Sequence, residues 1–179
     1  DIVHLHSCSA DLLDEGEVTR ALEDCAAAGK LRVVAYSGDG PALRYAIASG
    51  AFGSVMASVN LCDQQALRPL AEARACGLGT IAKRPLAGQP WRRDQPPDDA
   101  AHAEYWHRFR QLRGEPGFVA DDWEALALRF AAYAPGVDCV ALLEESTFAA
   151  PKISSRAATA PSSRPHLRPG LAPGVDGRC

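Results

Sequence analysis

The sequence repeats one pattern of hydrophobic and polar positions: a short apolar segment, a polar turn, an amphipathic segment and then a glycine. Apolar side chains at positions 18, 21, 22, 25 and 26 illustrate the amphipathic part, because this spacing places them on one face of a helix. Consecutive apolar segments start roughly 20 to 30 residues apart, the reach of a right-handed crossover between parallel strands. The pattern therefore predicts a parallel α/β sheet. The predicted strands are residues 2–6, 31–36, 55–59 and 78–82, and the intervening helices end at Gly29, Gly50 and Gly77.

Acidic residues mark the predicted helix starts. Asp39 and Asp63 precede the second and third helices and are predicted N-caps. After the fourth strand a proline-rich loop interrupts the repeat, and we expect a long polar helix over residues 98–113. Asp121 and Glu124 then have the spacing of a capping box. The predicted last unit is a helix that buries Trp123, Leu126, Ala127, Phe130 and Ala131, followed by a strand over residues 137–142.

Composition bounds the domain organisation. The chain has 179 residues, a net charge of -3 and 47% hydrophobic residues, which is typical of a globular protein with a real core. It is shorter than the roughly 250 residues of a complete eightfold β/α barrel. We expect residues 1–150 to fold and residues 151–179, with five Pro and five basic residues, to be disordered. A basic interaction arm is the alternative for that segment.

Charge and cysteine usage narrow the class of protein. No run of Lys or Arg suggests a nucleic-acid partner, and no apolar segment approaches the roughly 18 residues of a membrane span. We therefore expect a cytoplasmic protein without nucleic-acid or membrane partners. The cysteines form no C-x-x-C pair and are predicted to be reduced core residues. They are Cys8, Cys25, Cys62, Cys76, Cys139 and Cys179.

Two histidines stand in the first predicted strand. His4 and His6 are two residues apart and share one face, and His6 lies at the carboxyl end, where parallel α/β proteins build their active sites. A metal-binding pair is one interpretation, and a packed structural histidine at position 4 is the other. A catalytic metal needs at least three protein ligands. Because Asp39 and Asp63 are assigned to helix caps, the pattern favours the structural interpretation, and no metal site is predicted.

The second and fourth predicted strands also end in polar residues. Residues 36–40 form a glycine-rich turn before a helix, where backbone N–H groups and the Ser37 hydroxyl can bind an anion or an amide. Lys83 and Arg84 place two cations at the end of the fourth strand, as a diphosphate site requires. An ordinary tight turn and a solvated pair of charges are the alternatives. The functional interpretation is favoured because these residues and His6 lie at the carboxyl ends of the predicted parallel strands, along the same edge of the sheet.

The order of these motifs resembles the aldo-keto reductase family. The matching segments are residues 1–7, 29–38, 58–64, 81–87 and 127–138. The resemblance implies a partial (β/α)8 TIM barrel, about strands 4 to 8 with their helices. It also implies an oxidoreductase that reduces small-molecule aldehydes or ketones with NADPH, or alternatively NADH, and without metal.

The resemblance assigns roles to individual residues. His6 matches the histidine that orients the substrate carbonyl. Ser37 and Gly38 match the segment that holds the nicotinamide carboxamide. The cofactor's ribose and diphosphate would lie along Lys83, Arg84 and Leu86.

Departures from the family pattern limit the expected activity. The first strand matches the family's fourth, so we expect a fragment without the family's Asp, proton-donating Tyr and Lys, and without turnover on its own. Met56 stands where many relatives have a glutamine. The sequence after Val140 departs from the family, which suggests a frameshift near residue 140 or a genuinely different C-terminus.

Two alternatives remain: a non-catalytic half-barrel that binds a dinucleotide or protein, and a metal-dependent hydrolase that uses His4 and His6. For a partial barrel we expect self-association through exposed sheet edges.

Overall fold

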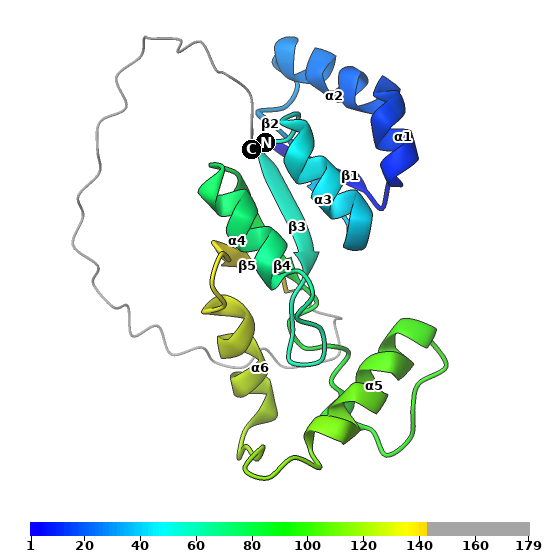
Figure 1. Cartoon of the computed structure of the whole chain (residues 1–179), viewed down its shortest axis with the longest axis vertical. Coiled ribbons are helices and arrows are strands. Elements are labelled where there is room, and N and C mark those ends of the chain that lie inside the picture. The colour runs from blue at the N-terminus through cyan, green and yellow to red at the C-terminus, as the bar shows by residue number, and fades with distance from the viewer. Residues whose placement is uncertain (143–179) are drawn as a thin grey trace, which may run out of the picture. The chain divides into compact units, whose positions relative to one another are not determined.

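The computed structural model of the chain describes residues 1–142. Within them lies one parallel five-stranded sheet with the order β1-β2-β3-β4-β5, which confirms the predicted parallel α/β architecture (Figure 1). The strands are β1 (Ile2–His6), β2 (Val33–Ser37), β3 (Ser54–Ser58), β4 (Gly79–Lys83) and β5 (Cys139–Val140). Three predictions lie outside the described residues: the boundary at residue 150, the disorder of residues 151–179 and most of the departure from the family sequence after Val140.

The helices alternate with the strands as predicted. They are α1 (Ala10–Glu15), α2 (Glu17–Ala27), α3 (Gly40–Ser49), α4 (Leu67–Ala75), the short 3-10 helix η1 (Pro90–Arg92), α5 (Ala100–Leu112) and α6 (Trp123–Ala132). The sequence pattern did not predict α1. Its start is fixed by Ser9, whose hydroxyl accepts from the Leu12 N–H, and Gly16 ends it in the left-handed conformation. The predicted polar helix is α5, which Asp99 caps through the His102 N–H at 2.9 Å.

Two predicted caps are wrong. The third helix begins only at Leu67, with Ala66 at the N-cap position, because Asp63 instead accepts hydrogen bonds from the Gln65 N–H and the Tyr105 hydroxyl. At the last helix the cap is Asp122, which accepts from Ala125, and not Asp121. Glu124, the predicted partner in the capping box, pairs with Arg92 at 2.7 Å. The carboxylates of Asp63 and Glu124 therefore bind other partners and do not cap a helix.

One face of the sheet carries the main hydrophobic core. Tyr36 and Val55 are in register on neighbouring strands, and both pack with helix residues such as Leu43 of α3 and Leu70 of α4. Residues in register with each other share a face, whereas successive residues of a strand point to opposite faces. The opposite face is therefore the one that carries the chemically interesting side chains. It comprises His4, His6, Ser37, Met56, Ser58 and Lys83.

A second cluster closes the carboxyl end of the sheet. Loop residues Leu61 and Ala87, which follow β3 and β4, pack against Tyr105 and Phe109 of α5 and Ala127 of α6. Figure 1 shows α5 beyond the arrowhead of β3, away from the core helices α3 and α4. This cluster accounts for the interruption of the repeat after β4: the inserted segment covers strand ends and adds no strand.

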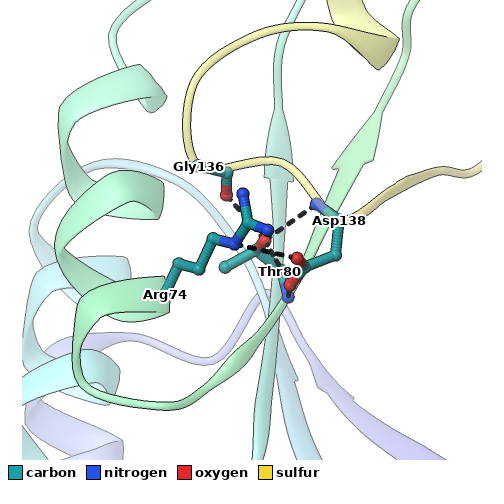
Figure 2. Close-up of polar contacts among 4 residues, drawn as sticks. All are labelled: Arg74, Thr80, Gly136 and Asp138. Atoms are coloured by element: carbon teal, nitrogen blue, oxygen red, sulfur yellow. Dashed lines mark hydrogen bonds and ion pairs between the residues drawn. The ribbon is translucent and has the colours of Figure 1, made fainter. Parts of the chain in front are cut away.

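The last strand is short and is held by polar contacts at its amino end (Figure 2). The Thr80 N–H donates to Asp138 Oδ2 at 3.0 Å, the Thr80 hydroxyl donates to the Gly136 carbonyl at 2.6 Å, and Arg74 pairs with Asp138 Oδ1 at 3.1 Å. Gly136 is required here, because a Cβ would lie 2.4 Å from the Ala71 Cα and φ is +85°. The predicted strand over residues 137–142 is thus reduced to two residues anchored by one carboxylate.

The cysteines are not all core residues. Cys8 and Cys62 are buried, as predicted, and burial raises the pKa of the Cys62 thiol to about 11. Cys25 is half-buried, whereas Cys76 and Cys139 are exposed, so the prediction is wrong for these two. Cys139 is exposed because it lies on the sheet face opposite the helices. Cys179 lies outside the described residues.

Candidate functional site

The carboxyl end of β1 presents His6. His6 is exposed and is in register with Ser37 of β2. The next residue, Ser7, has a positive φ of 52°. The Ser7 N–H donates to the Ser37 carbonyl at 2.8 Å, which fixes this turn against β2. Left-handed backbone is uncommon outside glycine and is concentrated at functional sites. The structure therefore brings His6 and Ser37 together, as the sequence predicts.

His4 lies one step deeper on the same face. It is half-buried, and its Nε2 atom is buried without a hydrogen-bond partner among the described residues. Burial lowers the pKa of this imidazole, because desolvation disfavours the charged form. Within residues 1–142, His4 is therefore packed, as the structural interpretation expects, but its Nε2 atom is not hydrogen-bonded.

Ser37 and Gly38 form a tightly held segment at the end of β2. Ser37 is 3% exposed, and its hydroxyl makes no hydrogen bond within residues 1–142. Gly38 donates its N–H to the Met56 carbonyl at 3.1 Å. A Cβ on Gly38 would lie 2.2 Å from the Tyr36 hydroxyl oxygen, so close approach demands glycine. The Tyr36 hydroxyl itself donates to the Cys8 carbonyl at 2.8 Å, and burial raises its pKa.

Asp39 occupies the predicted N-cap position of α3, but its side chain makes no capping hydrogen bond. The carboxylate instead contacts residues at the ends of β3 and β4. Oδ1 accepts from the Ser58 N–H at 2.7 Å, Oδ2 accepts from the Ser58 hydroxyl at 3.0 Å, and Oδ2 lies 3.2 Å from the Lys83 ammonium. One side chain thereby connects the ends of β2, β3 and β4.

The two predicted cations differ in their surroundings. The Lys83 side chain is 16% exposed and pairs with Asp39, so it is not the solvated charge considered above. Arg84 is exposed, and its charge contributes to the lowered pKa of Asp99, after the larger effect of the His102 N–H. Arg84 has a φ of 56°, and its carbonyl accepts from the Asn60 amide at 3.1 Å. A buried side chain therefore supports the strained backbone of this position.

Leu86 is not brought to the same place as the other predicted residues. It is half-buried and packs against the second cluster, the one formed with α5 and α6. Its carbonyl accepts from the Gln89 N–H at 2.8 Å in a turn where Ala87 and Gln89 also have positive φ. Leu86 thus lies under the loop that follows Arg84 and shapes it.

Three residues at this edge have roles that the sequence did not reveal: Asp39, Ser58 and Asn60. Asn60 is fully buried, donates to the Arg84 carbonyl and accepts from the Cys62 N–H at 2.9 Å. Ser58 and Asn60 lie in a segment that resembles the family, but no spacing rule links them to positions 39 and 84. The available signal was the pair of polar residues, Ser58 and Asn60, among apolar residues at the end of a strand.

The donor set fits a ligand with amide and phosphate groups better than a metal ion. It offers a hydroxyl from Ser37, an exposed guanidinium from Arg84 and an exposed imidazole from His6, which are typical partners for such groups. No group of three or more His, Cys, Asp or Glu that could hold a metal occurs within residues 1–142. The metal-dependent alternative thus finds no third ligand beside His4 and His6 there. In the same part of the chain, no helix is both long and apolar enough to cross a bilayer.

Comparison with known proteins establishes the fold. No family model matches the chain, and no curated protein matches it in sequence. Among solved structures, it is similar to the holo form of aldo-keto reductase AKR11C1 from Bacillus halodurans, with 20% identity and a TM-score of 0.63. The match covers 79% of this chain and 49% of that one, so this chain spans about half the length of that protein. The likeness confirms the predicted fold class: a parallel α/β sheet that matches part of a TIM barrel.

Proposed function

We propose that the chain forms the nicotinamide-dinucleotide-binding part of a carbonyl-reducing oxidoreductase of the aldo-keto reductase type. One observation carries the proposal. His6, Ser37 and Arg84 stand at the carboxyl ends of β1, β2 and β4 in a sheet that resembles half of the sheet in a reductase solved in its holo form. In open parallel sheets, ligands bind outside these strand ends.

Each residue of the proposed site has a task that its surroundings favour. The Ser37 hydroxyl, without a partner in the described residues, would bind the carboxamide, and the glycine at position 38 lets the segment pack closely against the Tyr36 ring. Arg84 would bind the diphosphate, while Leu86 supports the loop beneath it. His6 would donate a hydrogen bond to the substrate carbonyl and orient it. A bound reduced nicotinamide would supply the hydride.

The first test is a titration of the 179-residue chain with NADPH, followed by fluorescence of the reduced nicotinamide. We expect saturable binding that Arg84→Ala weakens about tenfold or more, because a hydrogen bond to a charged group contributes about 1.5 to 3 kcal/mol. Arg32→Ala is the matched control. Arg32 is an exposed cation that pairs with Asp1 and directly precedes β2, at the amino ends of the strands. Absence of saturable binding, or equal losses in both variants, contradicts the proposal. The same titration with NADH measures the cofactor preference.

Turnover separates the catalytic proposal from the binding-module alternative. For this chain we expect NADPH binding without carbonyl reduction, because no tyrosine takes the place of the family's proton donor in the resemblance. Loss of a general acid reduces such a step by roughly 10²- to 10⁴-fold. Carbonyl-dependent oxidation of NADPH that disappears in His6→Ala contradicts this expectation and assigns the chain a complete catalytic role.

A further inference from the structure

We propose that Asp39 and Lys83 form a positioning clasp for the dinucleotide site, in which Lys83 holds Asp39 and the adjoining Ser37–Gly38 segment and does not bind phosphate. The inference rests on the proposed function and deepens it. It replaces the role that the family resemblance suggests for Lys83, a contact with the cofactor's diphosphate, by an indirect one. Asp39, which the resemblance leaves without a role, becomes the centre of the arrangement.

The geometry places one carboxylate between three strand ends. Asp39 follows Ser37 and Gly38 directly, so its side chain reports the position of that segment. It accepts two hydrogen bonds from Ser58, at 2.7 and 3.0 Å, and lies 3.2 Å from the Lys83 ammonium. Ser58 and Lys83 are in register on β3 and β4. The clasp therefore fixes the turn after β2 against the ends of β3 and β4.

Burial distinguishes Lys83 from a phosphate ligand. Its side chain is only 16% exposed, and solvent screens its interaction with the adjacent carboxylate less than it would screen a fully exposed pair. Removing either partner leaves the other charge partly buried and unpaired, which is costly. The Asp39 side chain is 45% exposed, so solvent reaches the carboxylate more readily than it reaches the ammonium. Arg84, one residue further on, is the exposed cation.

The segment that the clasp holds is the one proposed to bind the carboxamide. The Ser37 carbonyl is fixed by the Ser7 N–H, and the Gly38 N–H is fixed by the Met56 carbonyl. These backbone contacts restrain the segment from β1 and β3, while the Asp39 side chain restrains it from β3 and β4. A loss of the clasp would therefore loosen the Ser37 hydroxyl without removing any group that touches the ligand.

A second clasp, at the amino ends of the strands, provides a matched control (Figure 2). Asp138 accepts from the Thr80 N–H and lies within hydrogen-bond distance of the Thr80 hydroxyl, both at 3.0 Å, and pairs with Arg74. Both clasps thus combine a carboxylate, a backbone N–H, a hydroxyl and a cation. The Asp138 clasp lies at the amino ends of β4 and β5, away from the proposed site. Its loss reports the structural effect alone.

The test is a double-mutant cycle read out as NADPH affinity of the full chain, with Asp39→Asn, Lys83→Met and the double variant. We expect each single change to weaken binding by roughly threefold to thirtyfold, and the double variant to bind no more weakly than the worse single variant, because contacting residues that act together are not additive. Asp138→Asn should leave the affinity unchanged. The losses should persist at high salt, whereas the loss in Arg84→Ala should shrink as screening weakens its phosphate contact.

Several results overturn the clasp. Tighter binding by Asp39→Asn would show that the released ammonium binds phosphate, and additive losses would show that the two residues act separately. An equal loss in Asp138→Asn would reduce the effect to general stability. If Asp39→Asn does not fold, Lys83→Met decides alone, because it leaves both Ser58 hydrogen bonds to Asp39 in place: a loss that shrinks with salt contradicts the clasp. If the unaltered chain binds no NADPH, the proposed function itself fails and the positioning role with it.

Discussion

At the scale of single residues, Gly38 shows how closely the edge of the sheet is built. A methyl group there would lie 2.2 Å from the Tyr36 hydroxyl oxygen and 2.6 Å from its Cζ atom, and the ring is 1% exposed and bound to the Cys8 carbonyl. We expect Gly38→Ala to lower the free energy of unfolding by about 1 to 3 kcal/mol, because an overpacked core has to shift. Urea denaturation of the full chain measures this change.

Gly79 is the control for that substitution. Gly79 is the exposed first residue of β4, and its added methyl would meet Ser54 Oγ at 3.4 Å, an ordinary contact. Gly79→Ala should therefore change the free energy of unfolding much less than Gly38→Ala. Equal stability of Gly38→Ala and the unaltered chain would mean that Tyr36 moves aside at little cost.

The residue scale is also where sequence reasoning stops. His6 and Ser37 could be placed side by side, because strand ends and register follow from the repeat. The contact between Asp39 and Ser58 could not, since the two residues are 19 positions apart and either could serve a local turn. A short polar side chain near a helix start has both local and distant acceptors or donors, and only the packed sheet decides between them.

At the scale of elements, the attachment of β5 depends on one titratable group. Hydrogen bonds from Thr80, first from its N–H and then from its hydroxyl, lower the pKa of Asp138, with a smaller contribution from Arg74. The ionised form therefore stabilises the fold above the unfolded pKa of about 3.9, and this contribution is lost as the pH falls through the folded pKa. We expect Asp138→Asn to cost about 1 kcal/mol at pH 7, a modest value because the group is partly exposed.

Denaturation between pH 3 and pH 7 checks this expectation. The curves of the unaltered chain and of Asp138→Asn should converge in acid. Arg74→Met should keep most of the pH dependence, because the hydrogen bonds from Thr80 contribute more than the ion pair. Parallel curves for the unaltered chain and Asp138→Asn would show that this carboxylate does not link β5 to acid stability.

Elements were predictable where local pattern and packing agree. β1 begins and ends at the predicted residues, and β2, β3 and β4 are shifted by one or two residues, because these short apolar strands are bounded by turn residues. α1 escaped prediction because it is only six residues long. The last strand is shorter than predicted because it is held by side chains such as Asp138 rather than by a long ladder.

At the scale of the whole molecule, within the described residues, no helix packs on one face of the sheet, and the two edge strands, β1 and β5, each pair on one side only. Helices pack on the face of Tyr36, whereas β1 pairs with β2 alone in residues 1–142, and its Ile2 and Val3 are 47% and 40% exposed. An uncovered strand edge with apolar side chains is a template for pairing with another chain. The fold class was predictable from the repeat, but the extent of this uncovered surface required the packed structure.

We expect the 179-residue chain to self-associate through this edge, so that its sedimentation coefficient rises with concentration. Val3→Lys should weaken the association about tenfold or more, because a charge on an edge strand opposes pairing with a second edge. Val119→Lys is the control: Val119 is 83% exposed but lies outside the sheet, in the segment between α5 and α6, so its substitution should leave the association unchanged. A monomer at all concentrations contradicts the expectation outright. Equal effects of the two lysines would instead assign the association to apolar surface in general, and the edge of β1 would lose its special role.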